Sequence, residues 1–330
     1  YASANSARIF WPVAAGMVDA YLAAALLLRA RTRRKPARSP AASVALSCGV
    51  LLALLVTGEL VSRAVIGKWW YLQYRPDPEL YWYNRPDLRD HTDATDPAPR
   101  TTNALGFRMT REVETPRPEN EYRIFTMGDS SAFGLGVRDD ETFPAVMERH
   151  LAVRADRPVM SINTACPGHT SAQGRVLLDR HGEDMDPDLL VWAYNNDPCL
   201  DTAMDRDRVA SSAAVRAVQR VLYRSDLYLL FRRVVLDLVY AGRLEHYRAR
   251  YPERQQDWVR RIPFEDYEAY LEGFVRTADE LGAQVLFVRM PLNRPLCEAK
   301  PIFLTSFDDG YRDHLSEFCE SRGIACADLE

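Results

Sequence analysis

From residue 121 onward, short apolar runs alternate with stretches of helical period. The apolar runs cover 122–127, 158–163, 189–194, 284–290 and 324–329. Helical periodicity occupies 142–154, 171–182, 264–282 and 307–322. Strands buried on both faces read as continuous apolar runs, and their alternation with helices is typical of a parallel sheet. We therefore predict an α/β domain with a flavodoxin-like, doubly wound five-stranded parallel sheet.

Small and polar residues follow the first three predicted strands. Gly128-Asp129-Ser130-Ser131 comes after the first, a loop containing Gly168 after the second, and Asn195-Asn196-Asp197 after the third. Doubly wound sheets bind ligands at the carboxyl ends of their strands. These loops are therefore the expected location of a functional site.

The chemistry of these loops fits nucleophilic catalysis. Ser130 offers a hydroxyl at a strand-to-helix turn, where a helix N-terminus favours developing negative charge. The Gly168 N–H and the Asn196 side-chain amide are suitable donors to an oxyanion. The alternative is an ordinary strand-to-helix turn, in which Asp129 is a helix cap rather than a catalytic group.

In this order, GDSS, a glycine and YNND resemble the SGNH/GDSL hydrolase family, which is defined by Ser, Gly, Asn and His in four blocks. The resemblance covers residues 121–330, and the preceding NALGFR is similar to exported bacterial members. Tyr194 stands where the third block has a glycine. The resemblance implies the SGNH hydrolase fold, a nucleophilic Ser130 and an oxyanion hole from the N–H groups of Ser130 and Gly168 and the Asn196 side chain. Supporting positions are Gly128, Asp129 and Asp197.

The fourth block of that family, Asp-x-x-His, occurs nowhere in residues 1–330. In the family its His is the general base, oriented by the Asp in the manner of a catalytic triad. Only His169 among the six histidines adjoins the predicted site, and we regard it as a weak substitute base. We expect the block, with the base, beyond Glu330. An inactive homologue is the alternative.

Two long apolar segments precede the predicted α/β domain. Segment 9–28 carries one charge, Asp19, and segment 41–66 begins with eighteen uncharged residues. Each approaches the roughly 20 apolar residues of a membrane-spanning helix. The loop 29–40 between them holds six Lys or Arg and no acid, so the positive-inside rule predicts that it is cytoplasmic. We expect two spans within residues 1–67 and the rest of the chain on the periplasmic side of an inner membrane.

Other assignments of these segments stay open. The second segment could be a cleaved signal peptide, although its apolar core is long for one. The first could pack against protein, because a carboxylate in mid-membrane is costly. Residues 1–67 carry a charge of +6 and the remainder about −10, given the total of −4, and this acidic body argues against nucleic-acid binding.

The sequence offers no sign of a metal or cofactor site. No Cys or His spacing typical of metal ligands occurs, so we predict neither a metal nor another cofactor. A disulfide could join Cys199 to Cys297 or, alternatively, Cys319 to Cys326. Free thiols are the other interpretation.

Two further regions complete the predicted organisation. Residues 68–120 are rich in aromatic residues and proline, which indicates a linker or cover. A helical insertion occupies about 199–262, and its stretch 213–251 could be a lid, a membrane-surface helix, a docking element or a helical pair packed on the core.

Two functions fit these expectations. The first is a membrane-anchored serine esterase or acyl-transfer protein that acts on acyl esters, above all acetyl esters, of envelope glycans or lipids. The second is a non-catalytic accessory subunit. Through its spans and residues 213–251 it would dock onto a membrane-embedded acyltransferase or another integral membrane complex.

Overall fold

The computed structural model describes residues 40–69, 74–92, 97–201, 203–209, 212–232, 234–235, 258–291 and 309–329. The predicted span 9–28 and nearly all of the basic loop lie outside these ranges. The chain divides into two compact units. One unit comprises residues 1–71 and 217–253, and the other comprises residues 72–216 and 254–330.

The first unit contains a long apolar helix, α2, from Pro40 to Trp69. Its segment Val44–Ala64 is long and apolar enough to cross a membrane, with a mean hydropathy of 2.2. Most of its apolar side chains are exposed. The predicted helix at 41–66 is thus confirmed as a helix, whereas its passage through a membrane stays a prediction.

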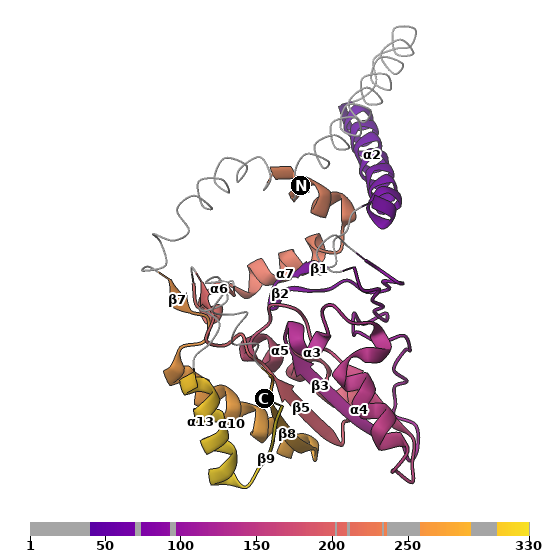
Figure 1. Ribbon diagram of the computed structural model, residues 1–330. Helices are drawn as coiled ribbons and strands as arrows, with labels where there is room; N and C mark the ends of the chain where they lie inside the picture. The colour runs from indigo at the N-terminus through magenta and orange to yellow at the C-terminus, as the bar shows by residue number, and fades with distance from the viewer. Residues whose placement is uncertain are drawn as a thin grey trace. The chain divides into compact units, whose positions relative to one another are not determined.

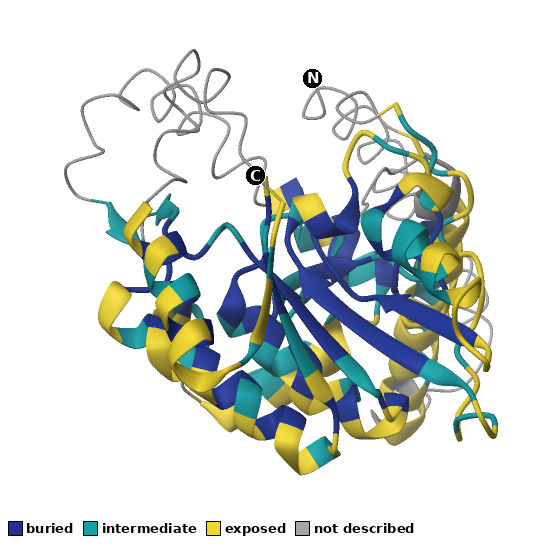
Figure 2. Cartoon of the chain, turned by 60° about the horizontal axis from the view of Figure 1, so that its bottom comes forward, coloured by how far each residue is buried: buried dark blue, intermediate teal, exposed yellow. Residues whose placement is uncertain are grey.

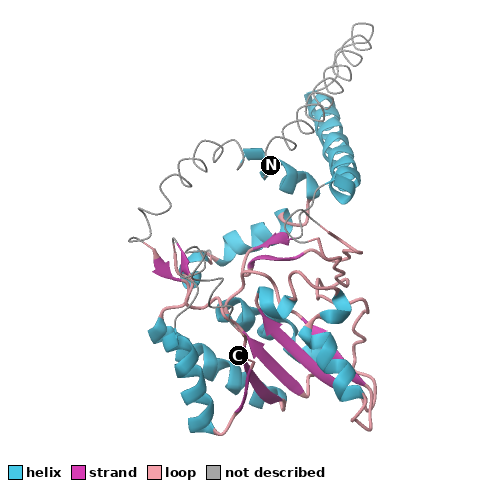
Figure 3. Cartoon of the chain, viewed as in Figure 1, coloured by secondary structure: helices cyan, strands magenta, loops and turns pink. Residues whose placement is uncertain are grey.

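The second unit is a mixed α/β structure around a five-stranded parallel sheet (Figures 1 and 3). Its strands are β3 (Tyr122–Gly128), β4 (Val159–Asn163), β5 (Leu189–Ala193), β8 (Gln284–Arg289) and β9 (Ala325–Asp328). They lie in the order β4-β3-β5-β8-β9. This is the flavodoxin-like order, in which the chain winds outward from the first strand in both directions. All five predicted strands are confirmed.

Helices cover both faces of the sheet, since alternate side chains of β3, β4, β5 and β8 enter two separate apolar clusters. On one face the strand residues pack with α5 (Ser171–Met185), α10 (Phe264–Leu281) and α13 (Asp309–Arg322). On the other they pack with α3 (Ser130–Phe133) and α4 (Phe143–Ala152). Figure 2 shows the central strands buried between helices whose outer surfaces are exposed, whereas β9 at the edge of the sheet is largely exposed. The four predicted helices are confirmed.

Two small antiparallel pairs accompany the main sheet. The hairpin of β1 (Tyr74–Asp77) and β2 (Tyr81–Asn84) precedes it. The second pair joins β6 (Leu200–Asp201) to β7 (Val259–Arg260). Shorter helices are η1 (Asp139–Glu141), α6 (Asp205–Arg208) and α7 (Ala213–Leu222), and residues 226–232 and 234–235 are helical as well. Because β6 pairs with β7, the predicted insertion leaves and re-enters the α/β unit at one place.

Candidate active site

The loop after β3 is shaped by a close approach of three backbone segments. A Cβ atom on Gly128 would lie 2.4 Å from the Cβ of Ala132 and 2.5 Å from the carbonyl oxygen of Ala193. Ala132 belongs to α3, and Ala193 ends the neighbouring strand β5. Only glycine therefore lets β3, α3 and β5 meet at this point.

Asp129 joins two of the strand-end loops. Its buried carboxylate caps α3 by accepting a hydrogen bond of 2.9 Å from the Ser131 N–H. The other oxygen accepts one of 2.7 Å from the Asn195 N–H, after β5. Burial raises the pKa of Asp129, and these hydrogen bonds oppose the increase. Asp129 therefore caps α3 and links the loop after β3 to the loop after β5.

Ser130 is the first residue of α3 and is half-buried. Within the described part of the chain, its hydroxyl has no hydrogen-bond partner. Its carbonyl accepts from the N–H groups of Gly134 and Leu135, which closes the short helix. The backbone of Ser130 is thus fixed while its hydroxyl stays available.

Gly168 lies in the loop after β4 with φ at +80°, a conformation that favours glycine. A Cβ atom there would lie 2.9 Å from the indole of Trp82. The same indole donates to the Pro167 carbonyl at 3.0 Å, and Arg261 donates to the Gly168 carbonyl. These contacts hold the carbonyls of Pro167 and Gly168 in place. No described residue accepts a hydrogen bond from the Gly168 N–H.

Asn196 connects the loop after β5 to the loop after β4. Its side-chain amide donates to the His169 carbonyl at 3.2 Å, which uses one of its two N–H bonds. The loop after β4 is tied in turn to β3, because the Cys166 N–H donates to the Gly128 carbonyl at 3.1 Å. Hydrogen bonds therefore connect the segments that carry Ser130, Gly168 and Asn196.

His169 is placed unlike a general base. Its imidazole is fully buried against the rings of Trp82 and Tyr83, with centroids 5.7 and 6.0 Å away. Its Nε2 lies 2.8 Å from the Trp82 carbonyl oxygen, so this nitrogen carries the proton and donates it. Burial lowers the pKa of His169 to about 3. The structure therefore argues against His169 as the substitute base.

Asp197 belongs to a buried polar cluster behind these loops. One carboxylate oxygen accepts from the Ser171 N–H at 2.7 Å, at the start of α5. Burial raises the pKa of Asp197 to about 7. Nearby, Arg261 makes two bonds to the Asp205 carboxylate, at 3.1 and 2.9 Å. The ion pair of Arg261 and Asp205 orients the Gly168 peptide, because Arg261 also donates to the Gly168 carbonyl. The Asp205 carboxylate accepts a further hydrogen bond of 2.6 Å from the Thr170 hydroxyl.

Sequence reasoning missed the groups that hold these loops from outside the sheet. The hairpin β1–β2 contributes Trp82 and also Asn84, which donates to the Ala165 carbonyl at 2.9 Å. Arg108 is buried and donates to the carbonyls of Phe133, the last residue of α3, and of Val137, which follows the helix. The predicted linker 68–120 thus braces the candidate site. No local motif distinguishes Trp82 or Asn84. Arg108 ends the NALGFR motif, but the motif does not indicate which segment Arg108 holds, because each of these residues acts on a segment distant in the sequence.

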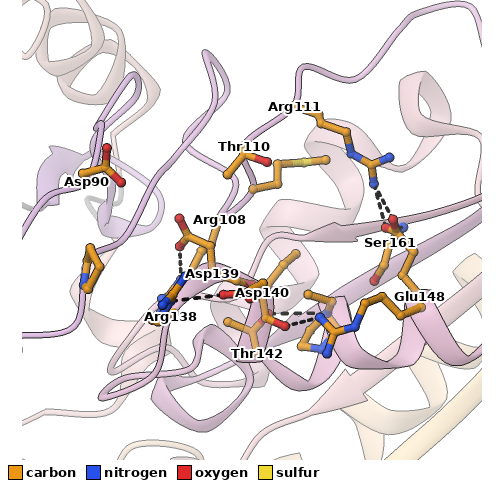
Figure 4. A pocket seen from close by; sticks show the side chains of 16 residues that line it. Asp90, Arg108, Thr110, Arg111, Arg138, Asp139, Asp140, Thr142, Glu148 and Ser161 are labelled. Carbon is orange, nitrogen blue, oxygen red and sulfur yellow. Dashed lines mark hydrogen bonds and ion pairs between the residues drawn. The ribbon is translucent and has the colours of Figure 1, made fainter.

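A cavity of about 610 Å³ lies beside α4 (Figure 4). Its charged groups pair with one another, as Arg111 does with Glu148 at 2.7 Å and Arg108 with Asp139 at 3.1 Å. Neither Ser130, Gly168 nor Asn196 lines it. In the described ranges no cluster of three His, Cys, Asp or Glu side chains could hold a metal ion.

No protein-family model matches the chain, and no curated protein matches it. Among solved structures, a lipase/acylhydrolase from Enterococcus faecalis aligns over 63% of this chain and 76% of its own, at 16% identity and a TM-score of 0.35. The esterase AlinE4, described as a SGNH-hydrolase family esterase, covers the same shares at 14% identity and a TM-score of 0.32. The psychrotrophic esterase EstA from Pseudoalteromonas sp. also covers these shares, at 14% identity and a TM-score of 0.30. At this degree of likeness the function has to rest on the side chains of this chain.

Proposed function

We propose that the α/β unit is a serine ester hydrolase or acyl-transfer domain of the SGNH type, anchored in a membrane by α2. The observation that carries the proposal is the hydrogen-bonded convergence of the segments bearing Ser130, Gly168 and Asn196 at the carboxyl ends of three adjacent strands. An available hydroxyl, a backbone N–H and a side-chain amide are the groups that acyl transfer requires.

The reaction would proceed through an acyl-enzyme. The Ser130 oxygen attacks the ester carbonyl carbon and gives up its proton to a base. The negative charge on the carbonyl oxygen is stabilised by the N–H groups of Ser130 and Gly168 and by the Asn196 amide. The alcohol then leaves with a proton, and water or an acceptor hydroxyl releases the acyl group from Ser130.

The described residues offer no candidate for the general base that would take the proton of Ser130. The family pattern places it shortly after the last strand of the sheet. Here that strand is β9, whose parallel register brings its carboxyl end to the same edge as that of β3. We expect a histidine from beyond Glu330 to take this role.

The substrate class and location are also proposed. We infer acyl esters, above all acetyl esters, of envelope glycans or lipids, on the periplasmic side of an inner membrane. The apolar helix α2 and the basic loop before it support this orientation.

An accessory role is the second candidate. It is favoured by the buried, neutral state of His169, the histidine next to the site. The chain would then present acyl groups, or hold a membrane-embedded acyltransferase, without its own turnover.

The test is ester hydrolysis by the full-length protein in membranes, with p-nitrophenyl acetate and an acetylated glycan as substrates. We expect turnover by wild type and background rates for Ser130→Ala. Ser131→Ala is the matched control, because the side chain of Ser131 is the neighbouring hydroxyl, and it should retain activity. Equal rates for wild type and Ser130→Ala would refute the enzymatic proposal and leave the accessory role.

A further inference from the structure

The cavity beside α4 lies within the α/β unit and apart from the candidate reaction centre (Figure 4). Its wall is formed by α4, the edge strand β4 and the segments 108–111 and 138–142. Its volume of about 610 Å³ falls within the range of roughly 300–1,000 Å³ that is typical of pockets for small ligands. An occupant of this cavity would not touch the three loops that carry Ser130, Gly168 and Asn196.

Ser161 places a buried hydroxyl in the wall of the cavity. Its neighbours on β4, Met160 and Ile162, enter the apolar cluster on the opposite face of the sheet, so the Ser161 side chain points toward α4. Ser161 is only 6% exposed, and its Oγ has no hydrogen-bond partner among the described residues. Leaving a buried hydroxyl without a partner costs free energy. The hydroxyl is therefore available to a group that enters the cavity.

A carboxylate and a guanidinium are held beside this hydroxyl. One oxygen of Glu148 accepts from the Ser161 N–H at 2.8 Å, and both of its oxygens accept from Nη2 of Arg111 at 2.7 Å. A guanidinium has five N–H groups and a carboxylate about four acceptor positions, so these bonds use only part of either group. Both side chains line the cavity and retain donors and acceptors for an occupant.

The charges around the cavity cancel. Four arginine side chains line it, together with four aspartate or glutamate side chains. They form ion pairs, such as that of Arg108 with Asp139. A charged ligand would meet like charges here and would compete with these pairs. An uncharged ligand avoids that cost, provided that its groups both donate and accept hydrogen bonds, as hydroxyl groups do.

The remaining wall is apolar. Pro99, Met109, Pro144 and Ala145 contribute non-polar surface. The occupant should therefore have C–H faces between its hydroxyl groups. A sugar ring combines these properties, because its hydroxyl groups project from the edge of the ring and its C–H bonds form the faces.

Two residues of the wall also support α3. Arg108 donates to the Phe133 carbonyl at 2.9 Å, and the Asn163 side-chain amide donates to the Ala132 carbonyl at 3.1 Å. A ligand in the cavity would therefore be separated by one side chain from the helix that begins with Ser130.

We propose that this cavity binds an uncharged sugar unit, with Ser161, Glu148 and Arg111 hydrogen-bonded to its hydroxyl groups. The inference goes beyond the proposed ester chemistry, because the cavity shares no residue with the candidate reaction centre. For a glycan substrate, this site would hold a sugar unit away from the reacting ester.

Saturation-transfer NMR on the full-length protein tests the proposal. An amine-oxide detergent is used, because it has no sugar headgroup. The neutral probes are the methyl glycosides of glucose, galactose and mannose and the disaccharide N,N′-diacetylchitobiose. Glucuronate is the charged probe, and inorganic phosphate is added as a competitor. None of the probes carries an ester, so the result does not depend on whether Ser130 is a nucleophile.

Three variants locate the binding. Ser161→Ala removes the unpartnered hydroxyl, and Ala145→Phe fills the cavity from α4. Thr277→Val is the matched control, because Thr277 on α10 is also a buried hydroxyl without a partner among the described residues, but it does not line the cavity. Ser161→Ala and Thr277→Val break no hydrogen bond of the described residues, so both should keep the Tm of wild type.

We expect saturation transfer to at least one neutral sugar in wild type and in Thr277→Val. The signal should be several-fold weaker in Ser161→Ala and absent in Ala145→Phe. No transfer to any neutral sugar in wild type would overturn the proposal, as would equal signals in wild type and Ala145→Phe. A Ser161→Ala protein that binds like wild type would overturn the role of the hydroxyl. Binding of glucuronate alone, or loss of the sugar signal on adding phosphate, would overturn the assignment to an uncharged ligand.

Discussion

Replacing Gly128 by alanine tests the close meeting of β3, α3 and β5 on which the candidate site depends. The new methyl group would lie 2.4 Å from the Cβ of Ala132 and 2.5 Å from the Ala193 carbonyl oxygen, where ordinary contact begins at 3.4 Å. Neither neighbour is the far end of a flexible side chain, so relief requires a backbone shift.

The magnitude follows from the cost of overpacking. An extra methyl group in a well-packed core typically costs about 1–3 kcal/mol, occasionally more. Two such short contacts place Gly128→Ala at the upper end, at about 3 kcal/mol of unfolding free energy. For a domain of this size, that corresponds to a fall of roughly 6–12 °C in Tm.

Thermal unfolding of the detergent-solubilised full-length protein, followed by tryptophan fluorescence, provides the assay. Gly136→Ala is the control, because Gly136 has φ at +84° but nothing within 4 Å of an added Cβ. It should cost only the strain of the left-handed conformation, about 1–2 kcal/mol. Adding Ala132→Gly to Gly128→Ala removes one of the two contacts and should restore part of the loss. A Gly128→Ala protein as stable as Gly136→Ala would refute this geometry.

Three further predictions concern the loops and thiols. Asn196→Ala should lower kcat for ester hydrolysis by about 100- to 1000-fold with a smaller change in KM, because it removes one oxyanion donor; steady-state kinetics that show an unchanged kcat would contradict this. Burial raises the pKa of Asp197 to about 7, so the folded protein keeps this proton where the unfolded chain, with a value near 3.8, releases it. The contribution of Asp197 to stability is therefore full below about pH 4 and is lost as the pH rises to about 7. Asp197→Asn keeps the acceptor for the Ser171 N–H, so in urea titrations its free energy of unfolding should rise relative to wild type across that interval. A difference between the two proteins that stays constant with pH would contradict the assignment. A hydrogen bond from Cys319 lowers the pKa of Cys326 to about 7. Iodoacetamide at neutral pH should therefore modify Cys326 first, and mild oxidation should join the two cysteines in a disulfide. Peptide mapping that finds Cys319 modified first would be inconsistent with this.

The sheet and the positions of the site residues could be predicted from the sequence for one physical reason. Parallel strands covered on both faces must be apolar throughout, so their ends are visible as the points where polar residues begin. Ser130, Gly168 and Asn196 each stand at such a point. The strand order then follows from the flavodoxin-like winding, and it brings the three loops together.

The supporting contacts could not be predicted, because they join segments far apart in the chain. Arg261 and Asp205 are separated by 56 residues, and Asn84 reaches Ala165 across 81. Nothing in the local sequence around either pair indicates its partner. The composition of 68–120 predicted a linker or cover, but it did not indicate that residues of this region brace the loops after β3 and β4.

His169 shows how closeness in sequence can mislead. It follows Gly168 directly, and no local pattern indicates which way its ring points. The positive φ of Gly168 turns the chain there, and the imidazole lies beneath the hairpin β1–β2, bonded to the Trp82 carbonyl. Its burial and its hydrogen bond to Trp82 therefore argue against a role as base, although it is close to Gly168 in the sequence.

The most direct test of the central claim is covalent labelling of the full-length protein in its membrane by a fluorophosphonate. The account predicts an adduct that peptide mapping places on Ser130, and loss of labelling in Ser130→Ala with Ser131→Ala unaffected. Labelling that persists in Ser130→Ala, or that maps to another residue, would contradict the claim that Ser130 is the nucleophile.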